Sequence, residues 1–158
     1  MAVFIKVDGI TGEAKAVGHE EWIECDSVQY GVGRAIHTPV GSSSKREASA
    51  PSISEVTVSK MMDSTSALLF QEACVGKAKL VEIHLVETGA EELNTYLELK
   101  LTNSMISGYS VGSGGDRPSE SITFNFTKIE QKYTPYDDQH EKGNPVTSGY
   151  DLTEGKKV

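Results

Sequence analysis

Alternation of apolar and polar residues along most of the chain predicts β-strands. Around Ile122 the apolar side chains fall on even positions, whereas beyond Thr127 they fall on odd positions, at Ile129 and Tyr133. Because side chains alternate strictly between the two faces of a strand, this inversion requires a β-bulge or a corner where the chain passes from one sheet to another. The pattern therefore favours a closed or double-sheeted β architecture.

The same alternation locates the other strands. Strands are predicted at residues 3–7, 22–32, 53–60, 79–87 and 96–106, with a short last strand at 146–152. One helix interrupts this series, since Asp63 or Ser64 can supply its N-cap and Gly76 can end it. The apolar stripe of this helix comprises Ala67, Leu69, Phe70, Ala73 and Cys74. The stripe is expected to lie on the sheets, which would place Cys74 in the core.

Residues 36–52 show neither the helical nor the strand period. Their serine, lysine, arginine and proline content predicts a solvated segment. Since long segments without secondary structure are usually functional or disordered, two interpretations stay open: a disordered surface loop, or a loop that binds a partner. We expect a single domain over residues 1–158, with this extended loop at about 36–52.

Composition excludes some classes of function. The chain has 15 basic and 23 acidic residues among 158, a net charge of −8, which argues against a sequence-independent grip on nucleic acid or anionic lipid. No apolar run approaches the roughly 20 residues needed to cross a bilayer, and the N-terminal segment lacks a signal-peptide pattern. We therefore expect a protein made and folded in the cytoplasm, without membrane insertion.

The search for catalytic, cofactor-binding or metal-binding residues finds none. His19, His37, His84 and His140 have no second ligand at metal-binding spacing, and we expect them to be solvated. The glycine-rich segment 112–117 precedes a strand rather than a helix, so a phosphate site is not predicted. The sequence therefore gives no positive evidence for an enzyme.

The two cysteines, Cys25 and Cys74, are far apart in the sequence and form no CxxC pair. Two buried, reduced thiols are expected, because an isolated pair in a chain made in the cytoplasm is usually reduced. A disulfide between them is the alternative.

Several longer stretches resemble one known family. They are FIKVDGITGEAK with His19-Glu20-Glu21, Val28-Gln29-Tyr30-Gly31, ISEVTVSK, STSALLFQEACVGK, SVGSGGDRPSESITFNFTKIEQKYTPYD and SGYDL. In order and spacing they resemble the haemolysin-coregulated proteins, Hcp, which are the tube subunits of bacterial type VI secretion systems. In relatives the loop after the second strand is often rich in glycine, whereas here it is rich in serine.

The resemblance implies a mainly β fold, a two-sheet β-barrel with one flanking α-helix. It also implies a homo-hexameric ring with a wide channel, ring-on-ring stacking into a tube, and partners among the contractile sheath, the spike protein and effector proteins. The tube subunit would be secreted without a signal peptide. A phage-derived tail tube protein and a β-sandwich carbohydrate-binding module are the alternatives, and a ring rather than a monomer in solution would favour the tube.

Candidate assembly residues follow from the strand pattern and the loop. Val28 and Tyr30 share one face of the predicted strand, so Ser27 and Gln29 point outward if the apolar face fills the barrel. We hypothesise that Ser27 and Gln29 face the channel. The loop residues that we expect to contact the next ring are His37, Pro39, Val40, Lys45 and Arg46.

Overall fold

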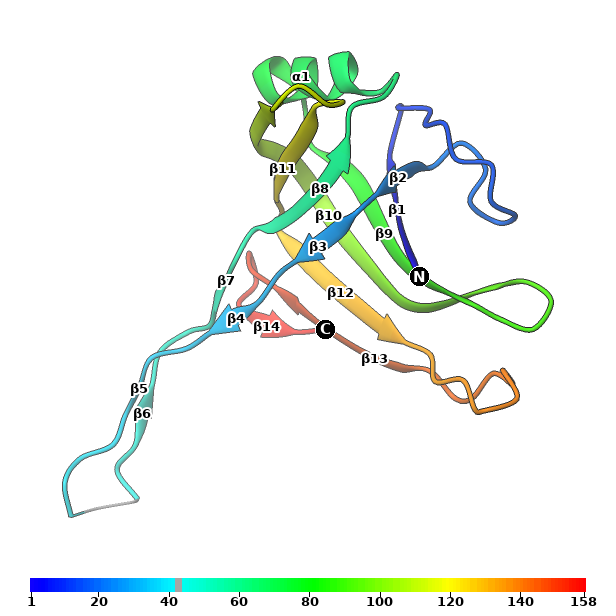
Figure 1. The fold of residues 1–158 in the computed structure, drawn as a ribbon. Helices are drawn as coiled ribbons and strands as arrows, with labels where there is room; N and C mark the ends of the chain where they lie inside the picture. The colour runs from blue at the N-terminus through cyan, green and yellow to red at the C-terminus, as the bar shows by residue number, and fades with distance from the viewer. Residues whose placement is uncertain (42–43) are drawn as a thin grey trace.

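A computed structural model, which describes residues 1–41 and 44–158, shows two antiparallel β-sheets that share one long strand (Figure 1). The large sheet contains β1 (Ala2–Val7), β2 (Ile23–Cys25), β9 (Lys79–Thr88), β10 (Leu93–Gly112), β12 (Lys128–Tyr133), β13 (Val146–Asp151) and β14 (Lys156–Lys157). The small sheet contains β3 (Ser27–Gln29), β8 (Val56–Met61), β11 (Ser119–Asn125) and the second half of β10.

The long strand β10 forms one corner between the sheets. Its first half pairs with β9 and β12, whereas its second half pairs with β11, and the register shifts between Ile106 and Gly108. The prediction ended this strand at residue 106, which was wrong, because the strand continues to Gly112.

The predicted corner near Thr127 is confirmed. β11 ends at Asn125 in the small sheet, and β12 begins two residues after Phe126, in the large sheet. Phe126 and Ile129 are both buried although one is at an even and the other at an odd position. The predicted strand at 22–32 is divided in the same way, since the chain passes between the sheets at Asp26, whose N–H donates to the Ser59 carbonyl at 2.7 Å.

The main apolar core fills the space between the sheets, and Phe4, Trp22 and Val86 form a second, smaller buried cluster. The fully buried members of the main core include Ile5, Ile23, Val56, Val58, Leu69, Ile83, Leu101, Ile122 and Phe124. The expected mainly β, two-sheet fold with one flanking helix is confirmed. The strand pairs themselves form one branched ten-stranded sheet and not a closed ring, because the chain at Asp26, rather than a strand pair, joins β2 to β3.

The helix α1 (Ser66–Val75) flanks the core where the prediction placed it, but its rotation differs. Leu69 is fully buried, whereas Phe70 is 58% exposed and Cys74 is exposed. The expectation that Cys74 lies in the core is therefore wrong, although Cys25 is buried and both thiols are free. The helix is apolar around most of its circumference, so its pattern did not determine which side faces the sheets.

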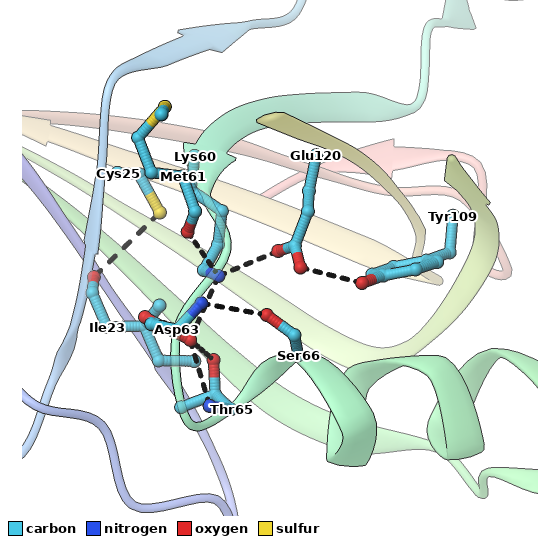
Figure 2. A network of polar contacts seen from close by, with 9 residues as sticks. All are labelled: Ile23, Cys25, Lys60, Met61, Asp63, Thr65, Ser66, Tyr109 and Glu120. Carbon is cyan, nitrogen blue, oxygen red and sulfur yellow. Dashed lines mark hydrogen bonds and ion pairs between the residues drawn. The ribbon is translucent and has the colours of Figure 1, made fainter. Parts of the chain in front are cut away.

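The start of the helix is tied to the sheets by a polar network (Figure 2). The N-cap position is Thr65, and the Asp63 carboxylate accepts the Thr65 backbone N–H at 2.8 Å in the turn just before it. Gly76 ends the helix as predicted, but in an extended rather than a left-handed conformation. Asp63 also accepts a hydrogen bond from Lys60, which fixes the helix to β8.

Candidate functional site: a projecting arm and two polar sheet faces

Residues 32–41 and 44–53 form a narrow antiparallel arm that projects from the body (Figure 1). β4 (Val32–Gly33) pairs with β7 (Ser52–Ile53) at its root, and β5 (Ile36–His37) pairs with β6 (Glu47–Ala48) farther out. The expectation of a segment without secondary structure was wrong here. These pairs are two residues long and mostly exposed, so they bury no face that would impose an apolar alternation on the sequence.

Hydrogen bonds hold the two sides of the arm together. At the root, the Ser54 N–H donates to the Gly31 carbonyl at 2.9 Å, and the Gly31 N–H donates to the Ser54 hydroxyl at 2.8 Å. Farther out, the Ser49 N–H donates to the Ala35 carbonyl at 2.8 Å. The arm therefore leaves the body as an ordered ribbon.

The arm carries positive charge and exposed apolar side chains. Three basic residues, Arg34, Lys45 and Arg46, accompany one acidic residue, Glu47, on a chain whose net charge is −8. The ion pairs formed within residues 1–41 and 44–158 do not involve these basic side chains. Val40 is fully exposed, at 104%.

All five residues proposed for ring contacts lie on this arm. They are His37 in β5, Pro39 and Val40 toward the tip, and Lys45 and Arg46 before β6. The proposed loop also includes residues 42–43, which lie outside the described residues. The contact of the arm with another copy stays a prediction.

An apolar groove of about 290 Å³, here called the arm-root groove, lies where the arm meets the body. Its apolar lining comprises Tyr30, Val32, Pro51, Ile53, Ile129 and Tyr150. The Tyr30 hydroxyl donates to Gln131 Oε1 at 2.9 Å, and Gln131 Nε2 donates to the Ser148 hydroxyl at 3.0 Å. The sequence did not predict this groove, because its walls come from four separate segments of the chain.

Two rows on the outward face of the small sheet are uncharged and rich in hydroxyl groups. Cross-strand partners share a face, so the register defines its rows. One row consists of Ser27, Ser59, Ser121 and Ser110, and the next consists of Gln29, Thr57, Thr123 and Gly108. None of these eight residues, here called the hydroxyl face, is ionisable. The prediction that Ser27 and Gln29 point outward is consistent with their exposure.

The outward face of the large sheet differs, because ionisable side chains of opposite sign alternate across it. One row consists of Lys6, Glu82, Lys100 and Glu130, and the next contains His84, Glu98 and Lys132. Lys132 Nζ lies 3.4 Å from Glu98 Oε2, and His84 Nε2 lies 3.5 Å from Glu98 Oε1. These seven residues are here called the charged face.

Two of the four histidines meet at the edge of the charged face. His19 is only 5% exposed, and its Nε2 lies 2.9 Å from Nδ1 of His84. The His19 ring stacks on Phe4 and meets the edge of Trp22. The expectation that these two histidines are solvated is wrong, because the turn that carries His19 folds back onto Trp22, a contact that the spacing of histidines does not reveal.

Burial sets the proton affinity of this pair. Desolvation lowers the pKa of His84 to about 4, an effect that the nearby Glu98 carboxylate partly opposes. Desolvation also lowers the pKa of His19. Both rings therefore stay neutral near pH 7, and one can donate its hydrogen bond to the other.

In the described part of the chain, no three His, Cys, Asp or Glu side chains gather closely enough to hold a metal ion. None of the helices described there is both long and apolar enough to cross a membrane. What the geometry offers is an arm, an apolar groove and two contrasting polar faces, which are suited to contacts between proteins.

Comparison with known proteins identifies the family. A family model described as "Type VI secretion system effector, Hcp" matches residues 4–133. The chain belongs to the Hcp family. It is 26% identical over 157 residues to Protein hcp1 of Pseudomonas aeruginosa, covering 95% of this chain and 94% of that protein. As an Hcp protein it is a structural tube subunit of type VI secretion, which decides against the carbohydrate-binding and phage-tail alternatives.

Solved structures agree with this assignment. One, described as the structure of a type six secretion system protein, has a TM-score of 0.91 and 26% identity, with 99% of both chains covered. Hcp1 from Salmonella typhimurium has a TM-score of 0.76 at 22% identity, covering 99% of this chain and 98% of that one, and it supports the fold. The Hcp fold therefore extends over the chain, including the segment that contains the arm.

Proposed function

We propose that this Hcp subunit assembles into hexameric rings that stack into the expelled tube, with the hydroxyl face lining the channel and the arm joining neighbouring copies. The contractile sheath, the spike protein and effector proteins are its partners in this proposal. The subunit would assemble in the cytoplasm and leave the cell with the tube.

The hydroxyl face is the observation that carries the lumenal assignment. Charged residues make up 24% of the chain, yet none occurs among the eight residues of this face. Short hydroxyl side chains offer many weak hydrogen bonds and no strong charge attraction, so a folded effector can be held and still move along the wall. Ser27 and Gln29 belong to this face, which extends their proposed lumenal position to β8, β11 and β10.

The charged face is better suited to the outside of the tube. Its side chains of alternating charge are well hydrated, and some of them pair across neighbouring strands. In this arrangement the large sheet meets solvent or sheath, whereas the small sheet meets cargo.

Thiol labelling tests which face lines the channel. Ser121→Cys on the hydroxyl face and Lys100→Cys on the charged face would be compared in a Cys74→Ser background, because Cys74 is exposed and Cys25 is buried. With a polymer-linked maleimide too large to enter the channel, we expect position 100 to react in assembled tubes and position 121 to be protected.

Dissociated subunits provide the control for that experiment, since both positions should then react. Equal labelling of the two positions in tubes, or protection of position 100 alone, would contradict the lumenal assignment.

A further inference from the structure

We propose that the arm-root groove is the receptor for the arm tip of a second copy of this chain, with Pro39 and Val40 entering it. This inference rests on the proposed function, because it names the surface that the arm contacts when copies assemble.

The groove is an apolar surface that the subunit leaves unfilled. Ile129, which is buried at the margin of the core, lines the groove together with Ile53 and Tyr150, which are partly buried. A volume of about 290 Å³ is at the lower end of ligand pockets, so it can take one or two side chains and not a folded element.

Hydrogen bonds organise the groove before anything binds. The chain of bonds from Tyr30 through Gln131 to Ser148 joins Tyr30, two residues before the arm, to β12 and β13. Burial raises the pKa of the Tyr30 hydroxyl, which keeps it protonated and able to donate. These hydrogen bonds already fix the side chains of the walls. Little side-chain entropy is therefore lost when a partner fills the groove, which favours binding.

The arm tip has the chemistry to fill the groove. Val40 is the most exposed of the large apolar side chains in the described residues, at 104%. Pro39 precedes it and restricts the backbone, so little conformational entropy is lost when the tip is fixed. Burying the Val40 side chain in an apolar site is favourable, because it removes apolar surface from water.

Geometry and charge favour a second copy as the source of that tip. β5 and β6 lie farther from the body than β4 and β7, so the tip of each arm points away from its own groove (Figure 1). The arm is cationic, with Arg34, Lys45 and Arg46, whereas the chain as a whole has a net charge of −8. Opposite charges therefore steer the arm of one copy toward the body of another.

A tip and a groove are different surfaces of one chain, so the contact is head-to-tail. Each copy supplies one tip and offers one groove, and such contacts continue from copy to copy into a ring or a stack. A reciprocal exchange of arms would instead stop at two copies.

Disulfide trapping tests this contact in the assembled, full-length protein. Val40→Cys would be combined with Ser148→Cys, which lines the groove, in the Cys74→Ser background. The matched control combines Val40→Cys with Thr147→Cys, because residue 147 is the neighbour of 148 on the other face of β13. Under mild oxidation we expect the 40/148 pair to give a ladder of linked species beyond the dimer, and the 40/147 pair to give at least tenfold less.

The possible failures are distinguishable. Intact rings that show no 40/148 linkage, linkage that stops at the dimer, or equal linkage by the 40/147 pair would each overturn the groove assignment alone. A parent protein that stays monomeric at every concentration would overturn the proposed function as well.

Discussion

At the scale of single residues, a buried polar network surrounds Lys60 and joins β8 to β11 and to the start of the helix (Figure 2). Lys60 and Glu120 have fully buried side chains, and Lys60 Nζ lies 2.7 Å from Glu120 Oε2. Lys60 also donates to the Met61 carbonyl at 2.9 Å and to Asp63 Oδ1 at 3.0 Å, so its three donors are used. Desolvation, with the hydrogen bond to Glu120, raises the pKa of Tyr109 to about 12, so its hydroxyl stays protonated and donates to Glu120 Oε1 at 2.7 Å.

Removing one partner of this ion pair should be costly. Lys60→Met leaves the Glu120 carboxylate buried without its cation, which we expect to lower the free energy of unfolding by about 3–5 kcal/mol. The double variant Lys60→Met with Glu120→Leu should recover part of that loss. Denaturant unfolding measures both, with the partly exposed Lys128→Met as the control. A loss for Lys60→Met no larger than that of Lys128→Met would contradict the role given to the network.

The buried histidine pair makes stability depend on pH. The unfolded state binds a proton at His84 below the ordinary pKa of 6.5, whereas the folded state does so only near about 4. The unfolded state therefore holds more protons between these values, so stability falls as pH decreases from 6.5 to about 4. The titratable groups beside His84 are Glu98, Lys132 and His19.

This pH dependence can be assigned to one residue. A pKa lowered to about 4 corresponds to roughly 2–3 kcal/mol lost by the lower end of that window. Thermal unfolding from pH 7 to 4.5 should show a steeper fall in Tm for the parent than for His84→Gln, while the exposed control His37→Gln should follow the parent. If Tm fell equally with pH for the parent and for His84→Gln, His84 would not be the source of the pH dependence.

Among the elements, the helix shows what the sequence pattern can and cannot determine. Its position followed from the capping residues and Gly76, but its rotation did not, because apolar residues surround it. A polar network ties the start of the helix to the sheets, from Thr65 through Asp63 to Lys60 of β8 and on to Glu120 of β11, and its last contact joins residues far apart in the sequence. Strand positions were predictable because one face of each strand is buried and the other meets solvent, which produces an alternating pattern. The arm was not predictable, since both of its faces meet solvent.

Adjacent leucines on the helix test the observed rotation. Leu69 is fully buried and Leu68 is 45% exposed. We expect Leu69→Ala to lower the free energy of unfolding by about 2–5 kcal/mol, because it leaves a cavity in the core. Leu68→Ala should cost less than about 1 kcal/mol by the same denaturant measurement. Equal costs, or the reverse order, would contradict the rotation seen here.

The arm can be removed without touching the core. Replacing residues 36–48 by a short turn retains β4 and β7 and deletes the exposed ribbon beyond them. We expect the Tm of the subunit to stay within about 2 °C, because no core residue is lost, while stacking of rings disappears in electron micrographs. Stacking that continues unchanged would remove the arm from the assembly contacts.

In the whole molecule, the contrast between the hydroxyl face and the charged face links fold to function. Sequence alone placed Ser27 and Gln29 on an outward face, because alternation within one strand suffices for that. The rest of the hydroxyl face required the register of four strands, which joins residues as distant as Ser27 and Ser121. The arm-root groove likewise required four segments to meet, so neither surface was predictable from local patterns.

The most direct test of the tube assignment is electron cryomicroscopy of the purified protein at a resolution that shows strands. We predict rings of six copies whose channel is lined by β3, β8 and β11, with Ser27, Gln29 and Ser121 facing the channel and the charged face outside. Rings whose channel is lined by Glu98, Lys100 and Glu130, or particles that are only monomers, would contradict it.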